Sequence, residues 1–107
     1  MSKPLLSSVK KVGNLLFLSG MIGKGDDKES KFRNTFEKIK AVLEENGLSM
    51  ENVVSATVYL EDISDRPKYL NPLWREYFPD NPPTRTCVEA GLAGGQIEIT
   101  VTAAIPN

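Results

Sequence analysis

The 107-residue chain contains no histidine and only one cysteine, Cys87. Without histidine, neither a Ser-His-Asp triad nor a Cys-His nucleophile system can form, and without Cys and His ligands no conventional zinc site can form. A lone thiol also cannot form an internal disulfide, which fits a reducing compartment. These absences exclude several classes of catalytic mechanism and leave no expected metal.

The chain also lacks long apolar runs and an excess of either charge. No segment approaches the roughly 18 apolar residues of a membrane-spanning helix, and Met1–Val12 mixes lysines and serines instead of offering a secretory signal. The net charge is −1 with Lys and Arg scattered along the chain, so the basic patch typical of nucleic-acid binding is missing. We therefore predict a cytoplasmic protein whose partner is not a nucleic acid.

Local patterns predict the first three elements of one domain spanning residues 1–107. Val9–Val12 and Leu15–Ser19 flank the turn-prone pair Gly13-Asn14, which predicts a β-hairpin. A helix is expected from Lys28 to Asn46, with Gly47 as its stop signal. Its apolar residues recur every three or four positions and share one helical face: Phe32, Phe36, Ile39, Val42 and Leu43.

The next segment, Val53–Leu60, is rich in β-branched residues and predicts a strand with Val54, Ala56, Val58 and Leu60 on one face. A second helix follows, and two starting points are compatible with the sequence. It can begin near Arg66-Pro67 with Asp65 or Ser64 as the cap, at a cost of about 3 kcal/mol for an interior Pro72. Alternatively, Asn71 is the cap and Pro72 occupies the first helical position, so that Leu73–Phe78 forms a short helix.

Two final strands are predicted at Thr84–Ala90 and Gln96–Ile105. The second alternates clearly, with Ile97, Ile99, Val101, Ala103 and Ile105 on one face and polar residues on the other. The resulting order, ββαβαββ, indicates an α+β domain in which both helices cover one face of a mostly antiparallel sheet. The other face is left for a partner, and a domain this small gains stability by burying such a face against copies of itself.

Two charged side chains are candidates for chemistry. Arg85 follows a Pro-Pro pair, and its rigid guanidinium fork matches a carboxylate through two parallel hydrogen bonds, although a strand-start arginine can also simply lie along the surface. Glu98, on the polar face of the last strand, can act as a base that orients a water molecule, or can be an ordinary solvent-facing carboxylate.

Three uncharged residues are weaker candidates. Ser19 precedes Gly20 at a strand end, where it can offer a hydroxyl group to a ligand or serve in a turn. Cys87 shares a strand face with Arg85 and is either a thiol with a lowered pKa or a small buried hydrophobe. Asn71 is interpreted as the helix cap.

Four segments resemble the Rid (YjgF) family of reactive intermediate deaminases, in the same order and over almost the whole chain. They are Val12–Gly20 (VGNLLFLSG), Ile39–Gly47 (IKAVLEENG), Val53–Leu60 (VVSATVYL) and Pro83–Glu89 (PTRTCVE) followed by Gln96–Ile99 (QIEI). The last pair is similar to the signature segment of the family.

The resemblance implies a homotrimer of chorismate-mutase-like subunits whose sheets form an inner barrel, with ligand sites in the clefts between subunits. In such a site the residue matching Arg85 binds the substrate carboxylate, and the residue matching Glu98 helps to position the hydrolytic water. Positions matching Ser19, Asn71 and Cys87 line or support the cleft. The implied reaction converts 2-aminoacrylate and related enamines or imines to 2-keto acids and ammonia, without a cofactor or a metal.

The chain also departs from the family pattern. Leu6 occupies the position of a common tyrosine, Met21 that of a common glutamine, and the connection Gly23–Ser30 is short. These changes are compatible with an alternative function, a non-catalytic module that binds small carboxylates in the same cleft. Ribonuclease activity, attributed to some relatives, gains no support from a near-neutral chain without histidine.

Overall fold

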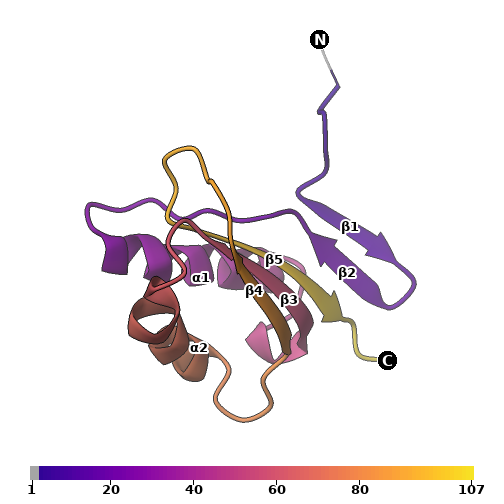
Figure 1. Cartoon of the computed structure of the whole chain (residues 1–107). Helices are drawn as coiled ribbons and strands as arrows, with labels where there is room; N and C mark the ends of the chain where they lie inside the picture. Colours follow the sequence, from indigo (N-terminus) through magenta and orange to yellow (C-terminus); the bar gives the residue numbers. More distant parts are fainter. Residues whose placement is uncertain (1–2) are drawn as a thin grey trace.

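The computed structural model describes residues 3–107 and shows an α+β fold (Figure 1). Five strands form one sheet in the order β1-β2-β5-β3-β4, in which only the β3–β4 pair is parallel. The strands are β1 (Val9–Val12), β2 (Leu15–Leu18), β3 (Val53–Leu60), β4 (Thr84–Glu89) and β5 (Ile97–Ala104). The mostly antiparallel sheet with two helices is therefore confirmed. Residues 1 and 2 lie outside the described residues. They belong to the predicted domain 1–107 and to the amino-terminal segment Met1–Val12.

Helix α1 (Lys28–Glu45) begins and ends with well-formed caps. At its start, the Asp27 carboxylate accepts a hydrogen bond from the Ser30 backbone N–H at 2.8 Å, and the Ser30 hydroxyl accepts one from the Asp27 N–H at 3.2 Å. At its end, Gly47 adopts a φ of +74°, which lets the Leu48 N–H return to the Leu43 carbonyl. The predicted helix and its glycine stop are confirmed.

The second helix begins near Arg66, as the first of the two predicted alternatives proposed. One wide π-helical turn, η2 (Arg66–Leu70), leads directly into α2 (Asn71–Tyr77). This wide turn ends two residues before Pro72, whose ring and missing N–H disfavour a regular α-helical turn at that point. The prediction that Asn71 caps the helix is wrong, because Asn71 is already helical and its side chain makes no cap bond. Asp65 does not cap by its side chain either; its Oδ2 lies 3.0 Å from Lys28 Nζ.

The two faces of the sheet differ in burial. Helices α1 and α2 lie along one face, and the alternating apolar residues of β5 from Ile97 to Ala103 are buried there. A register shift between Val53 and Ser55 interrupts the alternation in β3. The prediction that Val54 shares the buried face is therefore wrong: Val53 is buried, and Val54 is 44% exposed.

Exposed apolar side chains remain on the face without helices and on the segment before β1. Phe17 pairs with Thr102, and Val88 pairs with Tyr59, which places both on the open face, where each is more than 40% exposed. The segment before β1 runs away from the body of the molecule and exposes Leu5 and Leu6 (Figure 1). Within residues 3–107, none of the helices has the length and apolar character needed to cross a bilayer.

Candidate functional site

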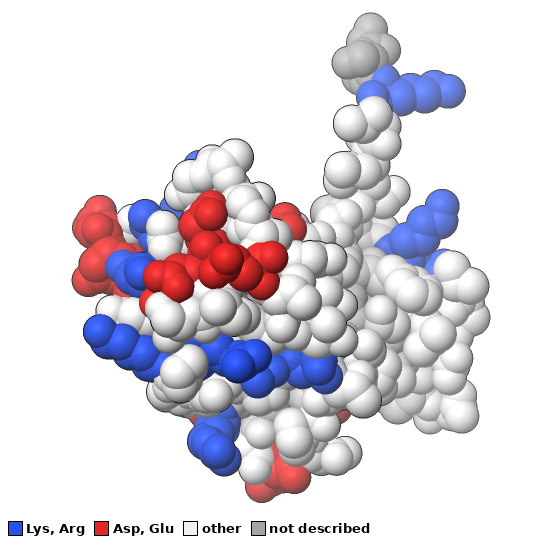
Figure 2. Space-filling model, in the orientation of Figure 1, with Lys and Arg blue, Asp and Glu red and all other residues white. Residues whose placement is uncertain are grey.

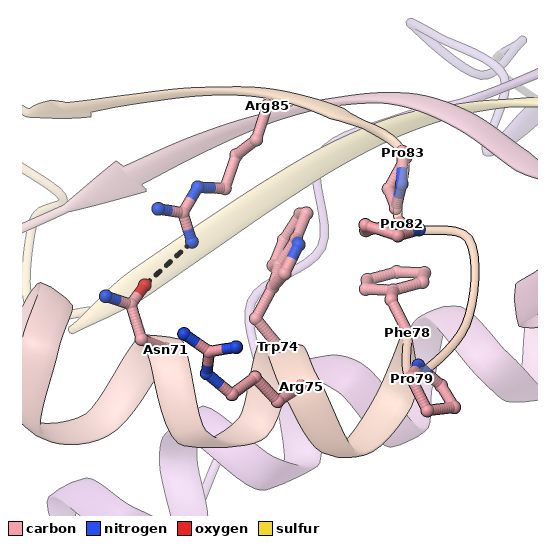
Figure 3. Close-up of a pocket in the computed structure, with 8 residues that line it drawn as sticks. All are labelled: Asn71, Trp74, Arg75, Phe78, Pro79, Pro82, Pro83 and Arg85. Atoms are coloured by element: carbon pink, nitrogen blue, oxygen red, sulfur yellow. Dashed lines mark hydrogen bonds between the residues drawn. The ribbon is translucent and has the colours of Figure 1, made fainter.

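Strand β4 and helix α2 together position Arg85. Arg85 is paired with Ala56 of β3, and Ala56 is paired with the buried Val101 of β5, so the Arg85 side chain projects from the face that the helices cover. There, Arg85 Nη1 donates a hydrogen bond to Asn71 Oδ1 at 2.9 Å (Figure 3). The guanidinium carbon lies 5.0 Å from the centroid of the Trp74 ring, within the range of a cation–π contact. These two contacts hold the guanidinium group in one orientation.

The Arg85 guanidinium borders a cavity of about 630 Å³ between α2 and the approach to β4. Its lining comprises Asn71, Trp74, Arg75, Phe78, Pro79, Pro82, Pro83 and Arg85. The aromatic and proline residues form an apolar wall, and polar groups come from Asn71 and the two arginines (Figure 3). A few polar groups set in an apolar wall are typical of sites for small organic ligands.

The charge of this cavity is not compensated by nearby carboxylates. The lining contains no Asp or Glu. Among residues 3–107, the ion pairs are Lys28–Asp65 and Arg33–Glu76, and neither involves an arginine of the cavity. Arg85 has five N–H donors, and its hydrogen bond to Asn71 uses only one nitrogen. The remaining donors are suited to a carboxylate ligand.

Cys87 follows Arg85 on the same face of β4. The thiol is partly buried against the core, and this burial raises its pKa above the ordinary value, an effect that outweighs the opposing influence of the Arg85 and Arg66 charges. Of the two interpretations drawn from the sequence, the small buried hydrophobe is therefore the one that the structure supports. A nucleophilic role for this thiol is not favoured.

Glu98 lies on the opposite face of the sheet. It alternates with the buried Ile97 and Ile99 and pairs with Tyr59, which places its carboxylate on the open face. Its neighbour there is Gly20: a Cβ on Gly20 would lie 2.9 Å from the Glu98 carboxyl carbon. Any side chain at position 20 would therefore displace the carboxylate, and glycine permits the backbone to approach it closely.

Ser19 belongs to this second group and not to the cavity around Arg85. Its hydroxyl donates a hydrogen bond to the Ser7 carbonyl at 2.7 Å, which joins the end of β2 to the segment before β1. Met21 is buried and exchanges backbone hydrogen bonds with Ile99, so its side chain belongs to the core. Of the predicted site residues, the structure thus brings together Arg85, Asn71 and Cys87 on one face, and Ser19 and Glu98 on the other.

Sequence reasoning missed most of the cavity lining, including Trp74 and Arg75. Trp74 is buried in the core, yet its ring also supports the Arg85 guanidinium. A signal was available in the spacing: Asn71, Trp74, Arg75 and Phe78 stand at positions i, i+3, i+4 and i+7, which places them on one helical face.

Comparisons with known proteins agree with this architecture. Residues 3–105 match the model of the family described as endoribonuclease L-PSP. A RutC family protein of Pyrococcus abyssi is 44% identical over 92 residues, which cover 78% of this chain and 71% of the relative. The 3-aminoacrylate deaminase RutC of Acinetobacter baylyi is 31% identical over 90 residues, which cover 77% of this chain and 71% of the relative. The crystal structure of a YjgF family protein from Neisseria meningitidis superposes with a TM-score of 0.90 at 30% identity, covering 99% of this chain and 92% of the other.

Proposed function

Because the chain belongs to the endoribonuclease L-PSP family, also called the YjgF or Rid family, we propose that it hydrolyses 2-imino acids and their enamine tautomers. The products are a 2-keto acid and ammonia, and 2-aminoacrylate is the simplest substrate of this class. The relative named 3-aminoacrylate deaminase acts, by its name, on an isomer of this enamine, which supports the choice of reaction.

The observation that carries the proposal is the held guanidinium of Arg85. Asn71 and the Trp74 ring fix its plane, and its unused donors face a cavity without competing carboxylates. A 2-imino acid presents its carboxylate next to the reacting carbon. Binding that carboxylate with two parallel hydrogen bonds therefore fixes the position of the C=N bond as well.

The chemistry then requires only a directed water molecule. The water oxygen forms a bond to the imine carbon, and the electron pair of the C=N π bond moves to nitrogen, giving a carbinolamine. The nitrogen then takes up the proton that the base accepted from the water, the C–N bond breaks to release ammonia, and the remaining hydroxyl loses its proton to become the keto oxygen. A protonated imine carbon is already electrophilic, so a carboxylate that accepts a proton from the water is sufficient as the base. We assign that role to Glu98.

The separation of Arg85 and Glu98 on two faces of one sheet supports an assembly in which different chains supply them. The open face carries the exposed Phe17 and Val88 as well as Glu98, and covering it with a second copy would bury this apolar surface. We propose the homotrimer implied by the family resemblance as this assembly. In it, the cavity of Arg85 from one subunit adjoins the Ser19–Glu98 region of its neighbour.

The direct test generates 2-aminoacrylate in solution with a serine dehydratase and follows pyruvate release with and without this protein. The expected result is faster pyruvate release in proportion to the concentration of added protein. An unchanged rate over a wide concentration range, from protein that binds pyruvate through Arg85, would contradict the deaminase assignment and support the alternative module that senses small carboxylates.

A further inference from the structure

A second guanidinium group, that of Arg75, borders the same cavity as Arg85. Arg75 lies four residues after Asn71 in α2, so the two side chains share one helical face, and Asn71 in turn contacts Arg85. Figure 3 shows the Arg75 side chain running along the helix toward Asn71, with its guanidinium group below that of Arg85. The cavity is therefore lined by two positive charges from two different elements: Arg85, which Asn71 and Trp74 hold in place, and the exposed side chain of Arg75.

Neither charge has an acidic partner among residues 3–107. The contrast with Arg33 is informative, because Arg33 holds Glu76 with two hydrogen bonds at 2.6 and 3.2 Å. Figure 2 shows Lys and Arg side chains gathered in a band over α2 and β4, with Asp and Glu side chains gathered above it. Two like charges beside one apolar wall repel each other, and an anion bound between them removes that repulsion.

The cavity is also large for the simplest substrate. In the single chain it is a solvent-open space of about 630 Å³, which is more than a three-carbon imino acid occupies. Trp74, Phe78 and the prolines provide apolar surface along its side. A ligand that fills this space has a carboxylate for Arg85, a short aliphatic chain along the wall, and a second anionic group for Arg75.

We propose, on the basis of the function proposed above, that the preferred substrates are 2-imino acids with a second carboxylate in the side chain. Arg85 binds the carboxylate next to the imine carbon, and Arg75 binds the side-chain carboxylate. Arg75 is thereby a specificity-determining residue for the reaction.

The test compares two imines generated in place by amino-acid oxidases, 2-iminosuccinate from aspartate and 2-iminopropanoate from alanine. Release of oxaloacetate and pyruvate gives kcat/KM for each, in the intact protein and in the variants Arg75→Gln and Arg66→Gln. The control residue Arg66 also carries charge close enough to influence Cys87, but it does not line the cavity.

We expect the ratio of kcat/KM for 2-iminosuccinate over 2-iminopropanoate to fall about tenfold in Arg75→Gln, mainly through KM, because a charge-assisted hydrogen bond is lost. In Arg66→Gln the ratio should change less than about twofold.

An equal ratio for the intact protein and Arg75→Gln, or an equal fall in both variants, would overturn the role of Arg75. Hydrolysis of 2-iminopropanoate in that case still leaves the deaminase function standing. Calorimetric binding of oxaloacetate and pyruvate tests the cavity without catalysis, since it compares a dicarboxylate with a monocarboxylate. Tighter binding of oxaloacetate that is lost in Arg75→Gln supports the two-arginine cavity even if neither imine is hydrolysed, whereas equal binding contradicts it.

Discussion

At the scale of single residues, Arg85 shows how one side chain can serve both packing and binding. Its guanidinium covers the Trp74 ring, which itself packs against Phe78 with ring centroids 4.7 Å apart. The strand position of Arg85 and its face shared with Cys87 were predictable from alternation and from the preceding prolines. Its partner was not: a helical Asn71 resembles a cap in sequence, and only the packing of α2 on β4 turns its amide toward Arg85.

This geometry predicts how Arg85 and Glu98 variants differ. Arg85→Ala should lower kcat/KM for imine hydrolysis by roughly 100- to 1,000-fold, because a preorganised donor is lost together with carboxylate binding. Arg85→Lys keeps the charge but not the fork, and should recover only part of the loss. Glu98→Gln should lower kcat while leaving pyruvate binding, measured by calorimetry, close to that of the unchanged protein. Weak pyruvate binding in Glu98→Gln would instead assign Glu98 to the carboxylate site.

At the scale of elements, the sequence predicted most strands and helices but not the irregular joins between them. The cost of Pro72 inside a helix depends on whether the preceding turn can widen, and the wide turn Arg66–Leu70 depends on how the segment packs. The bulge at Val53 and Ser55 is similar, because it requires pairing with β5 that alternation alone cannot reveal. Local patterns therefore located the elements, and tertiary contacts decided their details.

The cap of α1 gives a prediction about pH at this scale. The hydrogen bonds from the backbone and hydroxyl of Ser30 lower the pKa of Asp27 below its ordinary value of 3.8. A carboxylate with a lowered folded-state pKa stabilises the fold above the ordinary value, and the contribution is lost as pH falls through the lowered pKa. Thermal unfolding of Asp27→Ala should thus show a lower Tm at pH 7, with the difference from the intact protein narrowing below about pH 3.8.

The control variant Asp27→Asn retains a cap oxygen without the charge, so its Tm should fall less at pH 7 and depend less on pH. A difference in Tm for Asp27→Ala that stays constant down to pH 2 would contradict this account of the cap.

At the scale of the whole molecule, the arrangement of the sheet separates residues that the sequence suggested as a pair. Alternation within β4 and β5 gave the neighbours of Arg85 and Glu98 along each strand, but it did not relate the faces of the two strands. That relation follows from the register through β3, where Arg85 aligns with Ala56 and Val101, whereas Glu98 aligns with Tyr59 and Val88. The candidate site was therefore predictable as a set of residues and not as a geometry.

The separation predicts complementation between two inactive variants. If Arg85 of one subunit works with Glu98 of its neighbour, a trimer that mixes Arg85→Ala and Glu98→Gln subunits contains some sites in which both residues are intact. Random mixing in equal amounts gives such a site wherever a Glu98→Gln subunit supplies Arg85 and an Arg85→Ala subunit supplies Glu98, which is about a quarter of all sites. Refolding the two variants together should thus restore about a quarter of the unchanged activity, well above the mean of the variants refolded separately. One chain holds the two side chains on opposite faces of its sheet. If mixing does not raise the activity above the average of the separately refolded variants, Glu98 does not take part in the site of Arg85.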